Sequence, residues 1–266
     1  WNLMEQERSE ATIEKYIRDI NALFEWLPEG KRVDKPVTIA YKQSLLERGY
    51  ASSSINSMVA ALNSFFSYSE WGDCRIRPLR IQAQTMVSEE RKLTKEEYKR
   101  LLHAAKEKNE RLYLVMQSIC SVGLRVSELK FLTVEAVHRG RTVVNNKGKM
   151  RTVVLPPKLC LILKQYCRRQ RVTGGSIFVS RTGRPLDRSN IWSAMKELAK
   201  AAGVAADKVF PHNLRHLFAV TYYRMQKDIV HLADILGHSN IEYTRIYTFT
   251  SEEEHARVLS RMCLLI

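Results

Sequence analysis

The sequence predicts a mainly α-helical protein of two domains: an N-terminal helical bundle, then a mixed α/β, mostly helical domain with one small antiparallel β-sheet. Apolar residues recur at steps of three and four over most of the 266 residues. One pair of β-branched runs flanks a turn, and a segment without periodicity separates the two parts. A hydrophobic content of 45% is enough to give a chain of this length a substantial core.

The first domain is predicted to cover residues 1–82 as a bundle of helices. From Ser9, the stretch "SEATIEKYIRDINALFEWLPEG" carries an apolar stripe at helical spacing and stops at Pro-Glu-Gly. A second helix is expected over about 38–48, and a third after the serines at 52–54. We assign the apolar stripes of these helices to a common core.

A linker is predicted at residues 83–92, because "RIRPLRIQAQTMVSEERK" lacks a periodic stripe and ends in charge. The second domain then covers residues 93–266, and Thr94 and Glu97 have the spacing of a capping box that opens its first helix. In "RTVVNNKGKMRTVVLP", two β-branched runs around Asn and Gly predict a β-hairpin. "SIFVS" at 176–180 is the other expected strand. Further helices are expected over about 110–122, from Val126, and over about 157–170, 188–202, 211–225, 228–236 and 251–266.

The excess positive charge lies in the C-terminal two thirds of the chain. Lys and Arg number 43 against 28 Asp and Glu, which gives a net charge of +15. Residues 1–85 hold 11 of each sign, so the remaining 32 basic and 17 acidic residues carry the whole excess. An excess of this size indicates a polyanionic partner, and nucleic acid is the first candidate.

The five cysteines are scattered and form no C-x-x-C pair, which argues against a disulfide framework and a zinc site. We therefore expect a reducing, cytoplasmic environment. No basic-then-apolar leader opens the sequence, and no apolar run approaches the ~20 residues that span a bilayer.

Three hypotheses fit "HNLRH" at residues 212–216. Two histidines at i and i+4 have the spacing of a zinc-binding helix, but Asn213 stands where a metalloprotease needs glutamate, and the sequence offers no third ligand. In a plain helix, Leu214 and its apolar neighbours would face the core while His212 and Arg215 were solvated. Alternatively, His212 and Arg215 lie three apart on one helix face, where they could hold the same anion.

Three further residues extend the phosphate hypothesis. Arg125, in "SVGLRVSELKFL", precedes Glu128 by one turn, although a surface ion pair would explain this spacing equally well. His238 follows a helix-ending glycine in "LADILGHSNIEYTRIYT", and Tyr247 lies nine positions later in a short helical pattern. A lone tyrosine there would usually be a packing residue.

From about Leu93 to Thr248, the chain resembles the catalytic domain of the tyrosine recombinases, the phage integrase family. "GLRVSEL" resembles the family's first arginine box, "KGKMRTVVLP" its lysine hairpin, "HNLRH" its His-x-x-Arg box, and "LGHSNIEYTRIYT" its Gly-His box and nucleophile. Four motifs in the family's order are a specific signal. The N-terminal bundle is similar to the family's SAM-like core-binding domain through its helical pattern and phrases such as "INALFEWL".

The resemblance implies that Tyr247 attacks a DNA phosphodiester, leaving a 3′-phosphotyrosine link and a free 5′-hydroxyl. Arg125 and Arg215 would clamp the phosphate, since in-line attack spreads negative charge over its oxygens. His212 and His238 would donate hydrogen bonds to the same oxygens, and His212 would also take the tyrosine proton. Because the phosphotyrosine bond stores the energy for rejoining, neither a metal nor ATP nor another cofactor is expected.

A lysine of the hairpin would protonate the departing 5′-oxygen. Lys147 is our choice, but the turn is one residue shorter than the family pattern, so Lys149 is the alternative. Glu128 is expected to orient Arg125 or His216, and His216 is otherwise structural. Tyr243 is the rival nucleophile, to which we assign a packing role.

Double-stranded DNA recombination sites are the implied partner, held by two domains that close around the duplex. The resemblance also implies a tetramer on two duplexes, in which the C-terminal helix at about 251–266 is exchanged in trans, with docking in cis as the alternative. Accessory DNA-bending or excision factors and a nucleoid location in a bacterial, phage or mobile-element context are further expectations. The first domain offers basic residues as candidate DNA contacts: Lys31, Arg32, Lys35, Arg75, Arg77 and Arg80.

Three functions compete. A site-specific recombinase that integrates or excises a mobile element fits best. A type IB-like DNA topoisomerase shares the tyrosine chemistry, but the core-binding bundle and the small size disfavour it. A DNA-binding regulator without catalysis is disfavoured because every expected catalytic residue type is present.

Overall fold

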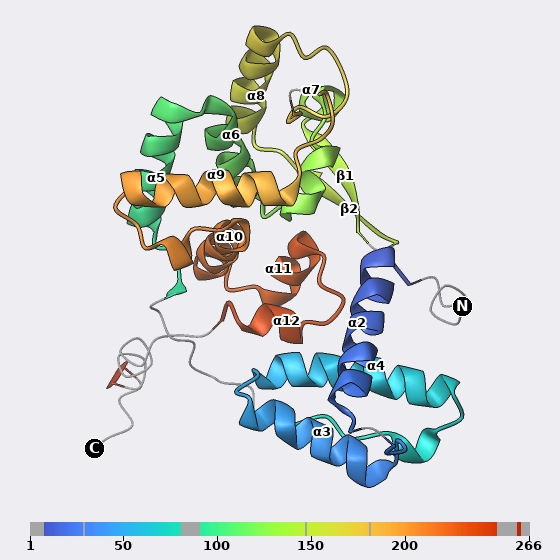
Figure 1. Cartoon of the computed structure of the whole chain (residues 1–266). Coiled ribbons are helices and arrows are strands. Elements are labelled where there is room, and N and C mark those ends of the chain that lie inside the picture. The colour runs from blue at the N-terminus through green and yellow to red at the C-terminus, as the bar shows by residue number, and fades with distance from the viewer. Residues whose placement is uncertain are drawn as a thin grey trace. The chain divides into compact units, whose positions relative to one another are not determined.

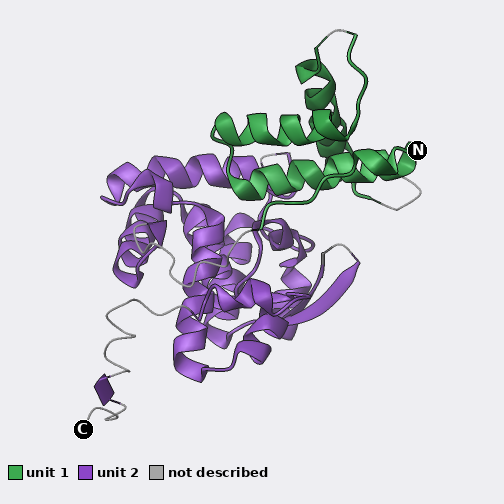
Figure 2. Ribbon diagram, turned by 90° about the horizontal axis from the view of Figure 1, so that it is seen from below, with its two compact units in different colours: residues 1–83 green, residues 84–266 purple. Residues whose placement is uncertain are grey.

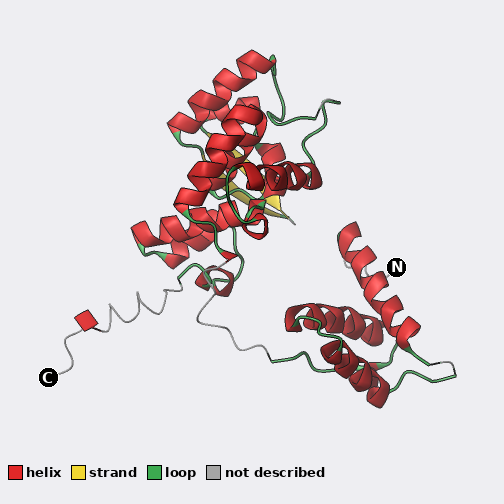
Figure 3. Ribbon diagram, turned by 60° about the vertical axis from the view of Figure 1, so that its left-hand side comes forward, coloured by secondary structure: helices red, strands yellow, loops and turns green. Residues whose placement is uncertain are grey.

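The computed structural model of the chain describes residues 8–28, 30–80, 91–146, 148–180, 182–248 and 260–261. The chain divides into two compact units, residues 1–83 and 84–266 (Figure 2). Helices dominate the described residues, and the one small sheet lies in the second unit (Figure 3). The predicted fold class is therefore confirmed. None of the described helices has the length and apolarity that a membrane crossing requires.

The described residues of unit 1 form three helices and one 3₁₀ turn (Figure 1). They are α2 (Glu10–Trp26), α3 (Lys35–Glu47), α4 (Ser52–Tyr68) and η1 (Gly72–Cys74). α3 begins three residues before the predicted start, because the Asp34 carboxylate caps it at the amide of Val37 and Pro36 fits the first turn. The core of unit 1 consists mainly of Leu23, Tyr41, Leu45, Ile55, Val59, Leu62 and Phe66.

Side-chain amides of α4 hold the extended segment that follows η1. Asn63 accepts from the amide of Ile76 and donates to its carbonyl, and Asn56 does the same with Leu79. Each asparagine thus satisfies both polar groups of one backbone residue, as a neighbouring strand would. The predicted linker at 83–92 lies outside the described residues apart from its last two positions.

Unit 2 has a helical core. Its larger helices are α5 (Lys95–Lys108), α6 (Glu110–Val122), α8 (Pro157–Gln170), α9 (Arg188–Ala201), α10 (Pro211–Gln226) and α11 (Ile229–Leu236) (Figure 1). The predicted capping box is present: Thr94 accepts from the amide of Glu97, and Glu97 accepts from that of Thr94. α10 packs against both α6 and α11. Residues 211–226 thereby connect the core to the region that holds the candidate site.

Unit 2 also contains short elements among its described residues. They are η3 (Val126–Phe131), α7 (Val134–Arg139), β1 (Arg141–Asn146), β2 (Lys149–Val154), η4 (Ala206–Lys208) and α12 (Glu242–Arg245). β1 and β2 form the predicted antiparallel hairpin, with Arg141 opposite Val154 and Asn146 opposite Lys149. Gly148 has a φ of 76° in the turn, which suits a residue without a Cβ.

The structure of unit 2 differs from the sequence prediction at residues 176–180 and at α7. Residues 176–180 form no strand; only isolated bridges join Ser176 to Thr133 and Val179 to Pro185, because each neighbouring segment contributes a single pair. α7 was missed, since six residues are too few for a periodic pattern, although Thr133 caps its start and Gly140 ends it with a φ of 69°. The helix predicted over 251–266 lies outside the described residues apart from Ser260 and Arg261.

Candidate active site

Three arginines from three elements meet at the C-terminal end of α11. Arg125 is the residue before η3, Arg151 lies on β2, and Arg215 lies on α10. Three successive backbone carbonyls accept their hydrogen bonds: Ile235 from Arg151 at 2.9 Å, Leu236 from Arg215 at 2.6 Å, and Gly237 from Arg125 at 3.2 Å. The end of a helix presents unpaired carbonyls and partial negative charge, which favours these cations.

Glu128 lies beneath this cluster and is 1% exposed. Its carboxylate accepts from the Arg125 side chain and backbone amide, both at 2.8 Å, and from two nitrogens of Arg151 at 2.7 and 2.9 Å. A terminal nitrogen of Arg215 lies 3.9 Å from Oε2 of Glu128. Burial alone would raise the pKa of Glu128, but hydrogen bonds from Arg151 and Arg125 outweigh it and lower that pKa. Of the two partners expected for Glu128, it contacts Arg125.

Arg215 is buried, with 3% of its surface exposed. One terminal nitrogen donates to the carbonyl of Gly123 at 2.6 Å, and the other to Leu236 and to Nε2 of His238 at 3.2 Å. Burial and the charge of Arg125 lower the pKa of Arg215 to about 10, so the guanidinium stays charged at neutral pH. The plain-helix hypothesis, in which Arg215 is solvated, is wrong.

His238 follows α11 and is held in one tautomer. Its Nε2 accepts from Arg215, because a guanidinium has no acceptor, so the ring proton lies on Nδ1, which donates to Oγ1 of Thr244 at 2.9 Å. Burial and the charges of Arg215 and Arg125 lower the pKa of His238 to about 4. The imidazole is therefore neutral at pH 7.

Tyr247 lies next to His238 and is 3% exposed. Its ring stacks on that of His238, with centroids 6.3 Å apart and planes inclined by 22°, and meets the edge of the His216 ring at 5.0 Å. Burial raises the pKa of Tyr247, and the charge of Arg215 opposes this rise. Tyr243, expected to pack, is instead 65% exposed, and its ring stands edge-on to His238 at 6.4 Å.

The two other histidines of the site lie on α10. His212 is at the exposed edge of the cluster, where desolvation and the charges of Arg215 and Arg125 lower its pKa. His216, one turn later, is partly buried against Tyr247, and burial lowers its pKa to about 4. Among the described residues, no group of three His, Cys, Asp or Glu could hold a metal ion.

A cleft of about 860 Å³ opens over this cluster. Of the residues named from the sequence, six line it: Arg125, Lys149, His212, His238, Tyr243 and Tyr247. Arg215 and Glu128 lie beneath it, and Lys147 is outside the described residues. The six basic residues named in unit 1 are all exposed, and Lys35 donates to the carbonyl of Arg75, which brings two of them together.

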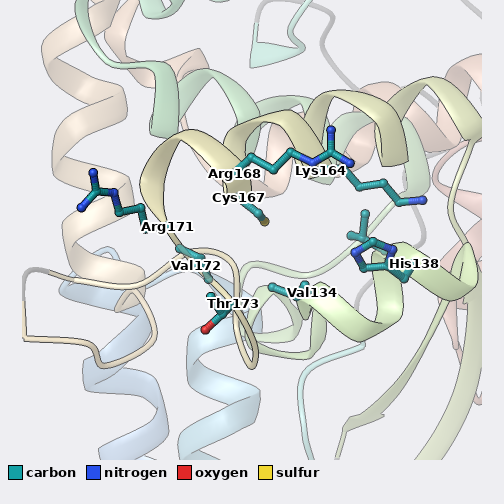
Figure 4. A pocket seen from close by; sticks show the side chains of 9 residues that line it. Val134, His138, Lys164, Cys167, Arg168, Arg171, Val172 and Thr173 are labelled. Carbon is teal, nitrogen blue, oxygen red and sulfur yellow. The ribbon is translucent and has the colours of Figure 1, made fainter.

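A second hollow, of about 560 Å³, lies between α7 and α8 (Figure 4). Its polar lining residues are His138, Lys164, Arg168, Arg171 and Thr173, and its other lining residues include Cys167. It shares no lining residue with the cleft, and no residue predicted for the chemistry lies in it. The cleft is therefore the candidate active site.

Two residues of the site, Arg151 and Thr244, were not predicted from the sequence. Arg151 stands in the quoted hairpin motif two residues after Lys149, and this spacing places both side chains on one face of a strand. Thr244 is fully buried, and its position in "EYTRIYT" carries no local signal of a histidine partner. The hydrogen bonds of Arg151 join residues 23 and 84 positions apart, and Thr244 lies six positions from His238.

Residues 91–254 match the phage integrase family, and residues 2–72 match the N-terminal SAM-like domain of phage integrases. The tyrosine recombinase XerA of Pyrococcus furiosus is 31% identical over 252 residues, covering 91% of this chain and 86% of that protein. The tyrosine recombinase XerD of Haemophilus influenzae is 27% identical over 277 residues, covering 97% and 93%. The chain belongs to the phage integrase family, the tyrosine recombinases. This confirms the predicted family and the predicted class of DNA breaking and rejoining enzyme.

Solved structures share the fold. The Tn1549 transposon integrase in complex with transposon right end DNA has a TM-score of 0.76 at 17% identity, covering 98% of this chain and 96% of that one. A lambda integrase dimer bound to a COC′ core site has a TM-score of 0.73 at 18% identity, covering 92% and 90%. At these identities the likeness concerns the fold alone.

Proposed function

We propose that the protein is a site-specific DNA recombinase that cleaves and rejoins strands through Tyr247 in this cleft. The phenol oxygen of Tyr247 attacks the scissile phosphorus, the bond to the 5′-oxygen breaks, and a 3′-phosphotyrosine link remains. Rejoining is the reverse attack by a 5′-hydroxyl. The observation that carries the proposal is the convergence of Arg125, Arg215 and His238 on the cleft that Tyr247 lines.

Arg125 and Arg215 would stabilise the charge on the non-bridging oxygens during in-line attack. In the DNA-free chain, Arg215 donates to His238, so Nε2 of His238 carries no proton. A bound phosphate would accept from Arg215 in place of His238, and its negative charge would favour protonation of the imidazole. His238 then becomes a second donor to the phosphate.

The phenol proton of Tyr247 passes to His212, and a hairpin lysine returns a proton to the 5′-oxygen. His212 suits this task because its lowered pKa keeps it neutral and able to accept near pH 7. Lys147 is the proposed acid, with Lys149 as the alternative. What supports a hairpin lysine is the placement of β2 along the cleft, where Lys149 is exposed.

The partner in this proposal is a duplex recombination site. The solved relatives named above are bound to transposon-end and core-site DNA. In unit 1, the exposed basic side chains between Lys31 and Arg80 would contact the backbone, and we expect affinity to fall steeply with salt. The proposal also includes assembly as a tetramer that exchanges the 251–266 segment between subunits, and the use of accessory DNA-bending or excision factors. It further includes a role in a mobile element and a location with the nucleoid in the cytoplasm.

The test is a trapping reaction on DNA that the protein itself selects. Duplexes bound from a random pool supply the site, and a nick next to the scissile phosphate lets the short 5′-hydroxyl fragment diffuse away. We expect a denaturant-resistant protein–DNA adduct without metal or ATP. Tyr247→Phe should abolish the adduct and keep DNA binding, while Tyr243→Phe should form it.

Each competing function predicts a different result. An absent adduct with intact binding would favour a regulator, and relaxation of any supercoiled plasmid regardless of sequence would favour a topoisomerase. An adduct that persists in Tyr247→Phe but not in Tyr243→Phe would reassign the nucleophile. Each outcome is read from the same purified proteins.

A further inference from the structure

We infer that Arg151 is a positioning residue for strand cleavage, which holds Glu128 and the end of α11 so that Arg125 and Arg215 are aimed at one phosphate. The inference rests on the proposed function. Arg151 belongs to none of the residues to which that function gives a chemical step. Its place on β2 links the hairpin to the arginine cluster.

The hydrogen bonds of Arg151 define its role. Nε donates to the carbonyl of Ile235 at 2.9 Å, and the two terminal nitrogens donate to the two oxygens of Glu128 at 2.7 and 2.9 Å. All three nitrogens are therefore engaged by the protein, and 12% of the side chain is exposed. Arg125, by contrast, is 28% exposed and binds Glu128 through one side-chain nitrogen. Arg125 is thus suited to contact the phosphate, whereas Arg151 is suited to hold Glu128 and the end of α11 in place.

Gly237 provides the space in which Arg151 lies. A Cβ at this glycine would lie 2.9 Å from Cδ of Arg151, and the residue has a φ of 64°. The carbonyl of the same glycine accepts from Arg125. Gly237 therefore adjoins both arginines. A shift of Arg151 would displace the Gly237 carbonyl, which accepts the hydrogen bond from Arg125.

Without Arg151, the carboxylate of Glu128 would lose two of its hydrogen-bond donors. The carboxylate is 1% exposed, and a buried carboxylate that loses a two-fold partner is costly to keep charged. The charged groups that face it are Arg125 from the start of η3, Arg151 from β2 and Arg215 from α10. Without Arg151, the pKa of Glu128 should rise, and its neutral form would bind Arg125 less firmly.

The test compares Arg151→Met and Arg151→Lys with wild type, and Arg168→Met on α8 serves as the control. We expect Arg151→Met to slow adduct formation at saturating protein by about 10²-fold, as misplaced catalytic groups do. Its DNA affinity and the slope of log affinity against log salt should match those of Arg168→Met. Lysine should not restore the rate, because an ammonium cannot pair with both carboxylate oxygens.

A pH profile separates positioning from a merely structural role. In Arg151→Met, the acid limb of the cleavage rate should move to higher pH as Glu128 becomes protonated. In a Glu128→Gln background, the Arg151 substitution should cause no such move and little further loss of rate. If Arg151→Met melts near the assay temperature, the same rates and pH profile are measured on Arg151→Lys, which keeps the positive charge.

Three results would overturn the inference. One is an adduct rate of Arg151→Met within a factor of about three of wild type. Another is a salt slope lower by about 1 than that of the control, which would make Arg151 a phosphate ligand. The third is full additivity with Glu128→Gln. If wild type itself forms no adduct, the proposed function fails and this inference with it; if wild type reacts and the variant equals it, only the inference fails.

Discussion

Oγ1 of Thr244 lies 2.9 Å from Nδ1 of His238, and this bond determines which nitrogen of the imidazole faces Arg215. Thr244 is fully buried on α12, three residues before Tyr247. The short helix therefore fixes the tautomer of His238 and the position of the phenol together. Any movement of α12 would change both at once.

Thr244→Val is expected to slow adduct formation by about 10-fold, because His238 loses the acceptor that holds its ring. The shape of the side chain is conserved, so DNA affinity should stay the same. The rate on the trapping substrate measures the loss, and Thr244→Ser, which keeps the hydroxyl, should recover most of it. Equal rates for valine and wild type would contradict a role for this bond.

Gly123→Ala is expected to destabilise the protein by about 2–4 kcal/mol. The glycine ends α6 with a φ of 68°, and a Cβ there would lie 2.6 Å from the Phe218 ring. Gly140→Ala is the matched control: its φ is 69°, but nothing lies within 4 Å of the added carbon, so it should cost only the ~1 kcal/mol of the left-handed backbone. Urea unfolding measures both, and equal losses would show that the Phe218 contact relaxes freely.

The general acid can be identified by changing the leaving group. A duplex with sulfur in place of the bridging 5′-oxygen expels a thiolate that needs no proton. We expect Lys147→Ala to lose about 10²-fold or more on the oxygen substrate and to recover on the sulfur substrate, while Lys149→Ala changes little on either. The reverse pattern would assign the acid to Lys149, and rescue of neither variant would remove the lysine from this step.

The free energy of unfolding should fall as the pH drops from about 6.5 to about 4. The folded protein holds the pKa values of His216 and His238 at about 4, through burial first and nearby positive charge second. The unfolded chain, with ordinary values of about 6.5, binds more protons in this window, so protonation favours unfolding. The contribution of His216 is about 1–2 kcal/mol after allowance for solvent screening.

Thermal unfolding between pH 7.5 and 4.5 checks this expectation. His216→Gln cannot titrate, so its melting temperature should depend less on pH than that of wild type. His103→Gln on α5 is the control, because His103 is exposed and lies far from the cluster in the chain. Parallel curves for wild type and His216→Gln would contradict the lowered pKa.

Most of the fold follows from local patterns. α6, α8 and the hairpin lie where periodicity and turn residues predicted them, because amphipathic spacing and capping signals act over a few residues. The prediction was wrong where an element depends on a distant partner. Residues 176–180 have the composition of a strand, but only single bridges are available to them.

The sequence by itself determined the class of chemistry, because the motifs hold the residue types in an order that can be read along the chain. Only the tertiary structure decided how those types are connected: which arginine is buried, that Thr244 orients His238, and that Arg151 shares the carboxylate of Glu128. The physical reason is that these bonds join residues separated by 6 to 112 positions, as between His238 and Thr244 or Arg125 and Gly237. Their geometry exists only once α10, α11 and the hairpin have packed around one buried charge.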